Sequence, residues 1–376
     1  MWVRELSLEN FRNFENLQVE LSQGVNIVYG DNANGKTNFI EAIYFCATGR
    51  SQRANNGREL VRFGQLEAHV QVIIEDGKCR SIDAHLFRDG KKKGIAIDHI
   101  PIKKLNQLFG MLLVVIFTPE DLRIVKAGPV ERRAFMDMEL CQLSNVYYHA
   151  LRQYHHALKQ RNNLLKTIAK SKDSTLMDTL FIWDAPLCEY GLKIMEHRAA
   201  FIEQTGQIAR DIHSSMTGAG EELNLTYRPQ VTDPSQYEER LKRNTTRDIA
   251  LGSTSVGVHK DDMGFAINGN DTRIYGSQGQ QRTAALSAKL AAIEAIKSRT
   301  GRMPILLLDD VLSELDEKRQ GFLLNHIKGL QTILTCTGVE DVLKKAEAEK
   351  IMKMENGNIY ANISSNGNIS RKEALK

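Results

Sequence analysis

The residues best suited to chemistry in this chain lie in one short stretch, Gly30-Asp31-Asn32-Ala33-Asn34-Gly35-Lys36-Thr37. The stretch has the spacing G-x-x-x-x-G-K-[ST] of a phosphate-binding loop. The two glycines let the backbone curl its N–H groups around phosphate oxygens, and Lys36 supplies a charge for the β- and γ-phosphates. The hydroxyl of Thr37 can bind Mg²⁺. These residues, together with Asn38, predict a nucleotide site.

The elements on either side of this stretch are those that a phosphate-binding loop requires. The apolar segment Val25-Asn26-Ile27-Val28-Tyr29 predicts a short buried strand before the loop. After the loop, Phe39, Ile40 and Ile43 recur at helical spacing. A helix that begins at the loop adds the dipole of its N-terminus to the binding of an anion. This context argues against a glycine-rich turn without a ligand.

A pair of carboxylates ends a second apolar segment, Pro304-Ile305-Leu306-Leu307-Leu308-Asp309-Asp310. A phosphate-loop enzyme needs an acid at the end of a neighbouring strand to hold Mg²⁺. A second carboxylate beside it can orient or deprotonate the attacking water. We therefore assign Asp309 to the metal and Asp310 to the catalytic base, with Lys36 as the other catalytic residue. The alternative is a buried strand that ends in a polar turn.

A further candidate anion site precedes these carboxylates, in Tyr275-Gly276-Ser277-Gln278-Gly279-Gln280-Gln281-Arg282. The apolar residues that follow it are spaced as on a helix. A serine and a glycine at a helix N-terminus direct a hydroxyl and free N–H groups at an incoming phosphate. Alone, the segment could be an ordinary helix cap. Its place shortly before the Asp309 strand makes it informative.

The composition limits the class of protein. The chain has 376 residues and a formal net charge of +4, so it can form two or three domains, and a nucleic-acid partner is permitted but not indicated. Its five cysteines are scattered, which argues against a zinc site or disulfides and for a reducing compartment. No apolar signal segment begins the chain, and the longest apolar run, Met111 to Phe117, is too short to span a bilayer. We expect a soluble cytoplasmic protein without a membrane partner.

The character of the sequence changes twice along the chain. Residues 1–130 are rich in predicted strands and include the phosphate loop, whereas residues 131–223 repeat apolar residues at helical spacing around the polar break Ser171-Lys172-Asp173-Ser174. This middle block predicts two long helices that form a hairpin. Residues 224–376 return to strands and helices and include the other motifs. We expect an α/β fold in which a helical domain is inserted into a nucleotide-binding domain built from both ends of the chain.

The order of these motifs resembles that of the ATP-binding-cassette ATPases, in which Walker A, a Ser-x-Gly-Gln signature and Walker B follow one another. Ser313-Glu314-Leu315-Asp316 matches the D-loop of that superfamily, at Ser313 and Asp316. Two departures are visible. Most relatives have Glu at the position of Asp310, and many have a switch histidine where this chain has Thr335-Cys336-Thr337, so the switch role is open or passes to Thr337.

This resemblance implies an ATPase head with a mixed sheet and flanking helices, and ATP and Mg²⁺ as its cofactors. It also implies an ATP sandwich, in which the signature of one subunit caps the nucleotide on the phosphate loop of another. The signature residues are Ser277, Gln278, Gly279 and Gln280.

Within that superfamily, the chain resembles the RecF family of bacterial recombination mediators. Its opening Leu8-Glu9-Asn10-Phe11-Arg12-Asn13-Phe14 is similar to the N-F-R start of the DNA-maintenance branch, which includes the structural-maintenance-of-chromosomes (SMC) proteins. The block between the two halves is too short for the coiled coils of those proteins. Phe117-Thr118-Pro119-Glu120-Asp121-Leu122, Arg132-Arg133 and Gly257-Val258-His259-Lys260-Asp261-Asp262 are similar to RecF motifs. The family usually has Gly-Pro-His-Arg where this chain has Gly-Val-His-Lys, and Lys cannot reproduce a bidentate Arg contact.

The RecF resemblance implies functions in DNA replication, repair and recombination. It implies an ATP-dependent homodimer that binds duplex DNA near single-strand gaps without regard to base sequence, and that helps RecO and RecR load recombinase. Slow, DNA-stimulated ATP hydrolysis would release the DNA. Arg12 and Asn13 would lie near the nucleotide.

The DNA contacts themselves can only be outlined from the sequence. Arg50, Arg53 and Arg58 follow the phosphate-loop helix, and further Lys and Arg lie along the helical hairpin. No aromatic residue lies between these arginines, which favours duplex over single-stranded DNA. The alternative for each arginine is solvated surface charge.

Two other functions stay open. The ATPase subunit of a membrane transporter would be a compact cassette, and the N-F-R opening and the inserted helices argue against it. A non-hydrolysing clamp would need ATP binding alone, and measured ATP turnover would distinguish it from an enzyme.

Overall fold

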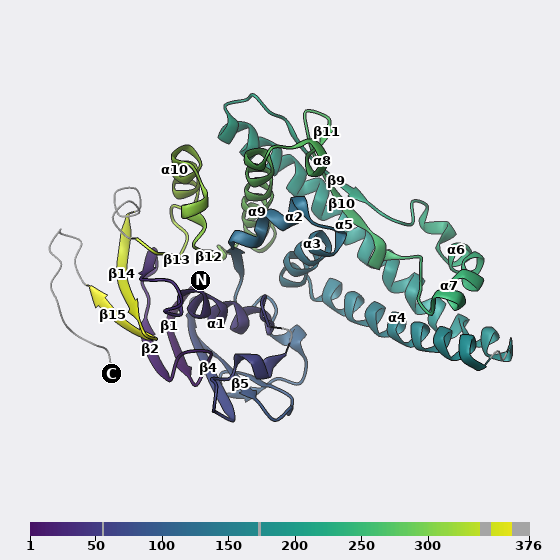
Figure 1. Ribbon diagram of the computed structural model, residues 1–376, viewed down its shortest axis with the longest axis horizontal. Coiled ribbons are helices and arrows are strands. Elements are labelled where there is room, and N and C mark those ends of the chain that lie inside the picture. The colour runs from purple at the N-terminus through teal and green to yellow at the C-terminus, as the bar shows by residue number, and fades with distance from the viewer. Residues whose placement is uncertain (55, 172–173, 339–346, 363–376) are drawn as a thin grey trace. The chain divides into compact units, whose positions relative to one another are not determined.

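The computed structural model describes residues 1–54, 56–171, 174–338 and 347–362. The chain forms two compact units, which Figure 1 shows with their elements labelled. One unit contains both ends of the chain, Met1–Asp121 and Ile296–Lys376, and the other contains Leu122–Ala295. The mixture of sheets and helices confirms the α/β fold class.

An antiparallel sheet forms one part of the unit that contains both chain ends. Its strand order is β2-β1-β4-β5-β6-β7. Burial alternates along β4, as it does in a sheet with one face covered. The strands are β1 (Trp2–Glu9), β2 (Asn16–Glu20), β4 (Glu67–Glu75), β5 (Cys79–Phe87), β6 (Gly94–Ile97) and β7 (Ile100–Pro101).

A mixed sheet with the order β15-β14-β3-β13-β12-β8 forms the other part of the same unit. All its neighbouring pairs are parallel except β14 and β15. Strands β12 and β13 are buried along their whole length, as is typical of parallel strands covered on both faces. The strands are β3 (Val25–Tyr29), β8 (Val114–Phe117), β12 (Ile305–Asp309), β13 (Thr332–Cys336), β14 (Ala348–Glu355) and β15 (Asn358–Asn362).

Helix α1 (Lys36–Thr48) contacts strands of both sheets, and α10 (Glu317–His326) follows β12. Because β3, β12 and β13 are parallel, their carboxyl ends meet at one edge of the mixed sheet. The phosphate loop, Asp309 and Thr335 all lie at this edge. The fold therefore brings together residues that are far apart in the sequence.

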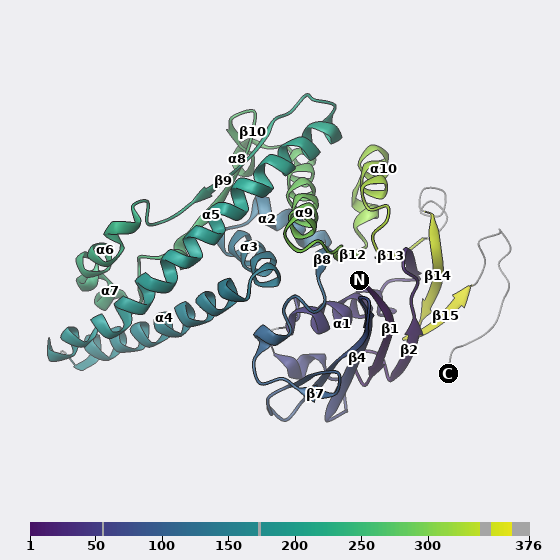
Figure 2. The same cartoon turned by 180° about the vertical axis from the view of Figure 1, so that it is seen from behind.

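The unit Leu122–Ala295 is built around two long helices, α4 (Asn145–Ser171) and α5 (Phe181–Thr217). Figures 1 and 2 show these helices side by side, as the expected hairpin requires. Lys172 and Asp173 of the expected polar break lie outside the described residues. Among the described residues, every helix is too short or too polar to cross a bilayer.

Shorter elements complete this unit. They include a three-stranded antiparallel sheet with the order β11-β10-β9. The long α9 begins in this unit and ends in the other one. The elements are α2 (Leu122–Lys126), α3 (Pro129–Leu143), β9 (Leu223–Arg228), α6 (Tyr237–Arg243), α7 (Thr245–Leu251), β10 (Asp262–Ile267), β11 (Asn270–Asp271), α8 (Thr272–Tyr275) and α9 (Gln278–Thr300).

The boundaries of this unit differ from the segment 131–223 that the sequence suggests for the inserted domain. Residues after 223 belong to the same compact unit as the hairpin, because β9 packs on α5, α6 packs on α5 and α7 packs on α4. Buried Arg161 of α4 reinforces this packing. Its guanidinium donates to Asp184 of α5 at 2.6 Å and to Asp248 of α7 at 2.7 Å.

Candidate functional site

The phosphate loop connects β3 to α1, and its backbone favours glycine at two positions. Gly30 has φ 155°, and a Cβ atom there would lie 2.2 Å from the carbonyl oxygen of Met354. Gly35 has φ 108°, in the left-handed region that favours glycine. Ala33 also has a positive φ, of 68°. The loop therefore has the curled backbone that the motif predicts.

The side chain of Lys36 lies inside this loop. Its Nζ atom donates to the carbonyl oxygens of Gly30 at 2.6 Å and Asp31 at 2.9 Å, and the residue is 7% exposed. Two backbone carbonyls thus hold the ammonium group where the motif requires it. Phosphate oxygens of a nucleotide could replace these carbonyls as acceptors.

Asn13 connects the loop with the first turn of α1. Its Nδ2 atom donates to the carbonyl oxygen of Asn34 at 3.1 Å, and its Oδ1 atom accepts from Nδ2 of Asn38 at 2.7 Å. The structure therefore places Asn13 and Asn38 beside the phosphate loop. The neighbouring Asp31 and Asn32 are exposed at the loop surface.

Arg12 contacts α1 through a buried carboxylate. Its Nε and Nη2 atoms donate to the two oxygens of Glu41, each at 2.9 Å. Arg53 reaches the same carboxylate at 2.7 Å and also donates to Oδ1 of Asn38 at 2.5 Å. Burial raises the pKa of Glu41. The hydrogen bonds from Arg12 and Ser51 and the charge of Arg53 together lower it by more, so that the pKa lies below its ordinary value. Glu41 is thus a charged anchor for two arginines next to the loop.

Asp309 ends β12 within reach of the phosphate-loop helix. Its Oδ1 atom accepts from the hydroxyls of Thr37 at 3.0 Å and Thr335 at 2.8 Å. Burial raises the pKa of this carboxyl, and the two hydroxyl bonds oppose that rise. A hydroxyl and a carboxylate that meet at a helix N-terminus are the oxygen ligands that Mg²⁺ prefers. Thr37 and Asp309 therefore could hold this ion.

Asp310 follows with a left-handed backbone, at φ 52°. Its backbone N–H donates to the hydroxyl of Thr335 at 3.0 Å. The buried Oδ1 atom of Asp310 has no hydrogen-bond partner among the described residues. A buried carboxylate oxygen without a partner at the edge of a nucleotide loop is suited to hold a water. Aspartate also tolerates the left-handed region better than most residues, which gives a physical reason for Asp at this position.

Thr335 was not singled out from the sequence, whereas Thr337 was. The hydroxyl of Thr335 contacts the carboxylate of Asp309 and the backbone N–H of Asp310, and Thr337 lies exposed beyond the end of β13. In the D-loop, the hydroxyl of Ser313 donates to the carbonyl oxygen of Asp310 at 2.7 Å. Asp316 accepts from the backbone N–H of Arg319 at 2.9 Å and so caps α10. In the sequence, the role of Thr335 is indicated only by its place at the end of a buried strand.

The signature segment begins α9, in the unit Leu122–Ala295. Ser277 and Gln278 are exposed, and Gly279 and Gln280 are half-buried. The backbone N–H of Gln280 donates to the Ser277 hydroxyl oxygen at 3.2 Å, and the backbone N–H of Ser277 donates to Oε1 of Gln280 at 2.9 Å. These reciprocal bonds form a capping box. The hydroxyl of Ser277 is an acceptor in this box, and its own proton can be donated to a phosphate oxygen.

The three predicted DNA-binding arginines lie in different surroundings. Arg50 and Arg58 are exposed, whereas Arg53 pairs with Glu41 and has a side chain that is 44% exposed. An exposed aromatic residue, Phe63, follows these arginines in the sequence. Phe63 is 93% exposed, and the guanidinium carbon of Arg88 lies 5.8 Å from the centre of its ring.

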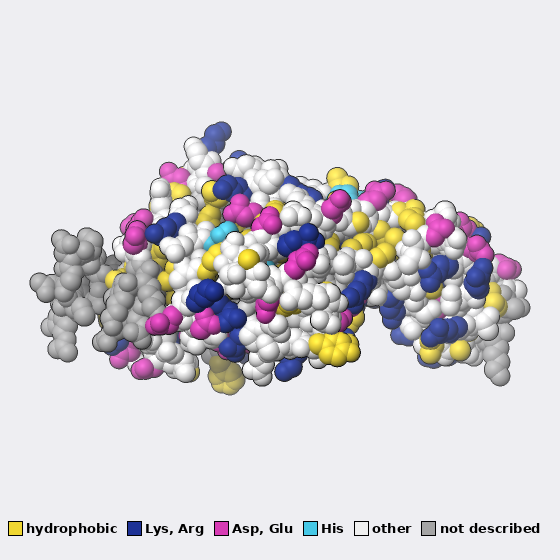
Figure 3. Space-filling model, turned by 90° about the horizontal axis from the view of Figure 1, so that it is seen from above, with side chains coloured by type: hydrophobic (Ala, Val, Ile, Leu, Met, Phe, Trp, Pro, Cys, Tyr) yellow, Lys and Arg dark blue, Asp and Glu magenta, His cyan; other side chains and the backbone are white. Residues whose placement is uncertain are grey.

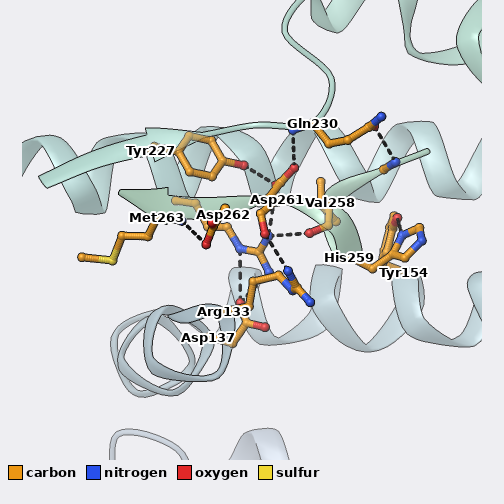
Figure 4. Close-up of polar contacts among 12 residues, drawn as sticks. Arg133, Asp137, Tyr154, Tyr227, Gln230, Val258, His259, Asp261, Asp262 and Met263 are labelled. Atoms are coloured by element: carbon orange, nitrogen blue, oxygen red, sulfur yellow. Dashed lines mark hydrogen bonds and ion pairs between the residues drawn. The ribbon is translucent and has the colours of Figure 1, made fainter. Parts of the chain in front are cut away.

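The motif Gly257 to Asp262 forms a second polar cluster, around Asp261 (Figure 4). The carboxylate of Asp261 is 1% exposed and accepts from Arg198 at 3.1 Å, from the Tyr227 hydroxyl at 2.5 Å and from the backbone N–H of Gln230 at 2.8 Å. Arg133 donates to the carbonyl oxygen of Asp261 at 2.6 Å. Side chains from α3, α5 and β9 thus meet at Asp261, and these bonds tie the three elements together.

His259 of the same motif is half-buried and bonded on both ring nitrogens. Its Nε2 atom lies 2.9 Å from the carbonyl oxygen of Thr254, and its Nδ1 atom lies 2.7 Å from the hydroxyl of Tyr154. Since a carbonyl only accepts, Nε2 carries the proton and Nδ1 accepts from Tyr154. Burial lowers the pKa of His259 to about 4. The imidazole is therefore neutral near pH 7.

Comparisons with known proteins identify the family of this chain. The family model RecF/RecN/SMC N terminal domain matches residues 2–360. A Lachnoclostridium phytofermentans protein, "DNA replication and repair protein RecF", is 50% identical over 96% of this chain and 99% of its own length. A Clostridium botulinum protein of the same name is 41% identical over 99% of this chain and 100% of its own.

Solved structures show the same similarity in three dimensions. A structure of the recombination mediator protein RecF-ATP in the RecFOR pathway has a TM-score of 0.89 at 34% identity, over 96% of this chain and 97% of that one. An SMC head domain from Pyrococcus yayanosii has a TM-score of 0.56 at 13% identity, over 96% of each chain. The second likeness concerns the fold alone, which is that of an ATP-binding-cassette ATPase head with an inserted helical unit. The family model and the close relatives over the full length show that the chain belongs to the RecF family.

Proposed function

We propose that this chain is an ATP-dependent DNA-binding protein of recombinational repair and replication-gap processing in the bacterial cytoplasm. ATP induces a homodimer that binds duplex DNA near single-strand gaps and helps RecO and RecR load recombinase, and a weak, DNA-stimulated ATPase releases the DNA. The names of the relatives and of the similar solved structures support this role. The observation that carries the proposal is the meeting of Lys36, Thr37 and Asp309 at one edge of the mixed sheet.

The phosphate loop and the two carboxylates divide the work on ATP. The loop amides and Lys36 bind the β- and γ-phosphates, while Thr37 and Asp309 hold Mg²⁺, which neutralises charge on the phosphates when bound. Asp310 positions the attacking water through the carboxylate oxygen that lacks a partner among the described residues. Asn13 keeps the loop against α1 while the nucleotide enters.

The signature completes the site in the dimer. Ser277 of one copy donates its hydroxyl proton to the γ-phosphate held by the phosphate loop of the other copy, and the N-terminus of α9 adds its N–H groups. ATP thereby joins the two copies, and hydrolysis removes the γ-phosphate that both copies bind. The nucleotide state then controls the oligomeric state.

The DNA contacts are directed at the sugar-phosphate backbone. Figure 3 shows acidic and basic side chains interspersed on the face in view, so any DNA contacts on that face are made by local basic groups. Helix α4 offers such a group, because it contains no Asp or Glu. Arg152, Lys159 and Lys166 are exposed on it, and none of the three forms an ion pair among the described residues.

Their spacing supports this assignment. Residues seven apart lie on the same face of a helix, so the three charges form a stripe about 21 Å long. In the other unit, Arg50, Arg53 and Arg58 are separate DNA contacts in this proposal, and the pairing of Arg53 with Glu41 makes it the one whose DNA contact would respond to the nucleotide site.

The ATPase subunit of a membrane transporter is set aside, because the chain belongs to the RecF family and contains a long helical unit. A clamp that binds ATP without hydrolysing it is distinguished from the proposed enzyme by measuring ATP turnover.

Gel filtration at one protein concentration, with ATP, with ADP and without nucleotide, tests the proposal. We expect a dimer with ATP and a monomer in the other two cases, and Lys36→Met should stay monomeric throughout. A wild-type chain whose oligomeric state does not depend on nucleotide would contradict the ATP sandwich. Dimerisation with no measurable ATP turnover, with or without duplex DNA, would leave the non-hydrolysing clamp.

A further inference from the structure

Glu221 belongs to none of the nucleotide motifs, yet it contacts the signature directly. It lies in the loop between α5 and β9, and its Oε1 atom accepts from Nε2 of Gln280 at 2.8 Å. Its side chain is 24% exposed. A partly buried carboxylate that accepts from an amide makes a hydrogen bond of the stronger, charge-assisted kind.

The partner of Glu221 is the residue on which the start of α9 depends. Oε1 of Gln280 accepts from the backbone N–H of Ser277, and the backbone N–H of Gln280 donates to the Ser277 hydroxyl. The side-chain amide of Gln280 therefore bonds on both sides: its Oε1 atom belongs to the capping box, and its Nε2 atom donates to Glu221. If the Nε2 end is not held, the amide can rotate and the box loses its fixed geometry.

The second oxygen of Glu221 connects the signature to α5. Oε2 lies 3.1 Å from Nε2 of His213, which is fully buried near the end of α5. Nδ1 of His213 lies 3.3 Å from the hydroxyl of Ser287. Gln280 and Ser287 are seven residues apart on α9 and so lie on the same face of it. The side chains of Gln280, Glu221, His213 and Ser287 therefore form a chain of polar contacts that begins and ends on α9.

The backbone next to Glu221 is fixed as well. The backbone N–H of Glu222 donates to Oδ1 of Asn268 at 2.8 Å, and the backbone N–H of Asn268 donates to the carbonyl oxygen of Glu222 at 3.0 Å. Glu221 is thus held at a defined place by the turn between β10 and β11. A carboxylate placed in this way can orient another side chain without moving itself.

We propose that Glu221 is a positioning residue for the signature: it locks Gln280 so that the Ser277 hydroxyl is oriented for the γ-phosphate of a second copy of this chain. This inference rests on the proposed ATP sandwich. Glu221 does not touch the nucleotide in this scheme, so it affects the joining of two copies and not the binding of ATP by one copy. His213 makes the end of α5 part of the same support.

A double-mutant cycle tests the proposal. The variants are Glu221→Ala, Gln280→Ala and the combination, each compared with wild type. Sedimentation with ATPγS gives the dimer dissociation constant, and a fluorescent ATP analogue at low protein concentration gives the affinity of the monomer. We expect unchanged monomer affinity and dimerisation weakened about 10- to 100-fold in each single variant, which is the loss expected for one charge-assisted hydrogen bond. The double variant should be no weaker than either single one, because both changes remove the same interaction.

Two further variants separate positioning from general damage. Glu222→Ala is the matched control, because Glu222 neighbours Glu221 and its own side chain lies 3.6 Å from Arg210 at the surface; it should dimerise as wild type does. Glu221→Gln keeps a carbonyl acceptor for Gln280 and should dimerise more tightly than Glu221→Ala. If Glu221→Ala unfolds, the comparison of Glu221→Gln with wild type and with Gln280→Ala still tests the contact.

The outcomes distinguish this inference from the proposed function. Additive effects in the cycle, or wild-type dimerisation by Glu221→Ala, would overturn the role of Glu221 while the sandwich stands. Dimerisation of Ser277→Arg with ATPγS would instead refute the sandwich itself.

Discussion

The hydroxyl of Thr335 donates to Oδ1 of Asp309 at 2.8 Å, and the same hydroxyl accepts from the backbone N–H of Asp310 at 3.0 Å. One side chain at the end of β13 therefore bonds both the carboxylate of Asp309 and the backbone of Asp310 at the end of β12. Oδ1 of Asp309 also accepts from Thr37 at 3.0 Å, which ties the acids to the start of α1. Three chain segments that are distant in the sequence thus fix the positions of Asp309 and Asp310, the residues proposed to hold Mg²⁺ and to act as the base.

Replacing the base should separate ATP binding from hydrolysis. We expect Asp310→Asn to bind ATP and to dimerise but to hydrolyse ATP about 10²- to 10⁴-fold more slowly, the usual cost of losing a general base. Asn tolerates the left-handed backbone at φ 52°, so the fold should be unaffected. Single-turnover hydrolysis and gel filtration with ATP check the two parts. Glu314→Gln is the comparison, and a larger loss there than in Asp310→Asn would move the base to Glu314.

Removing the charge of the phosphate loop should abolish productive ATP binding. Lys36→Met keeps the unbranched shape of a side chain that is 7% exposed, while the loop loses its cation for the β- and γ-phosphates. We expect at least about 100-fold weaker binding by calorimetry, since charged hydrogen bonds contribute about 1.5–3 kcal/mol each. Thr37→Ala should weaken only the Mg²⁺-dependent part. Equal ATP affinity in Lys36→Met and wild type would rule out the phosphate-loop assignment.

Blocking the signature should prevent dimerisation and leave the monomer site intact. The side chain of Ser277 is exposed at the start of α9, so Ser277→Arg places bulk and charge where the γ-phosphate of another copy would bind. We expect wild-type ATP affinity at low protein concentration and no ATP-induced dimer in sedimentation. Ser313→Ala offers a milder comparison in the D-loop. A fully dimeric Ser277→Arg protein would place the signature outside the interface.

The sequence was most informative where local chemistry and fold rules coincide. Gly30, Gly35, Lys36 and the two acids could be assigned because a phosphate loop follows a strand and because parallel strands end at one edge of a sheet. The α/β class was predicted from the strand and helix patterns, and the RecF resemblance from the N-F-R opening, the short helical insertion and the motifs such as Gly257 to Asp262.

The roles of single supporting residues could not be predicted in the same way. Thr335 and Glu221 contact residues far away in sequence. Only its place at the end of an apolar segment marks Thr335, and nothing in its own neighbourhood marks Glu221. The left-handed φ of Asp310 also depends on its tertiary surroundings. The extent of the inserted unit depends on β9 and β10, whose pairing spans Leu223 to Ile267 and joins them to the hairpin.

Neutral His259 should make folding stability sensitive to mild acid. The unfolded chain protonates this imidazole near its ordinary pKa of about 6.5, whereas burial lowers the pKa to about 4 in the folded chain. The unfolded state therefore binds more protons between these values, and the contribution to stability that is present above pH 6.5 is lost as the pH falls. We expect a loss of about 2 kcal/mol between pH 7 and pH 5 from this residue.

Urea unfolding of wild type and His259→Gln at both pH values measures this contribution. Gln can donate to the Thr254 carbonyl and accept from the Tyr154 hydroxyl, so it replaces both hydrogen bonds without titrating. The variant should lose less stability than wild type on acidification. The same pH dependence in both proteins would show that the imidazole is not neutral when buried.

The basic stripe of α4 should account for part of the salt dependence of DNA binding. Each lost phosphate contact lowers the slope of log K against log salt by about 0.9 on duplex DNA. Replacing Arg152, Lys159 and Lys166 together by Gln should therefore reduce the slope by about 2.7 per subunit if all three contact phosphates. Fluorescence anisotropy with duplex DNA and ATP over a salt series gives the slope. Arg53→Ala, measured in the same series, tests the arginine that pairs with Glu41.

The control is Lys242→Gln on α6, because Lys242 already pairs with Glu238 at 2.7 Å and should leave the slope unchanged. Binding should also weaken when ADP replaces ATP, since only the ATP state joins two copies and doubles the number of contacts. If the triple variant has the same slope of log K against log salt as wild type, the stripe does not contact DNA. Equally tight binding with ATP, with ADP and without nucleotide would break the proposed link between the nucleotide site and DNA, because the stripe would then act on the monomer alone.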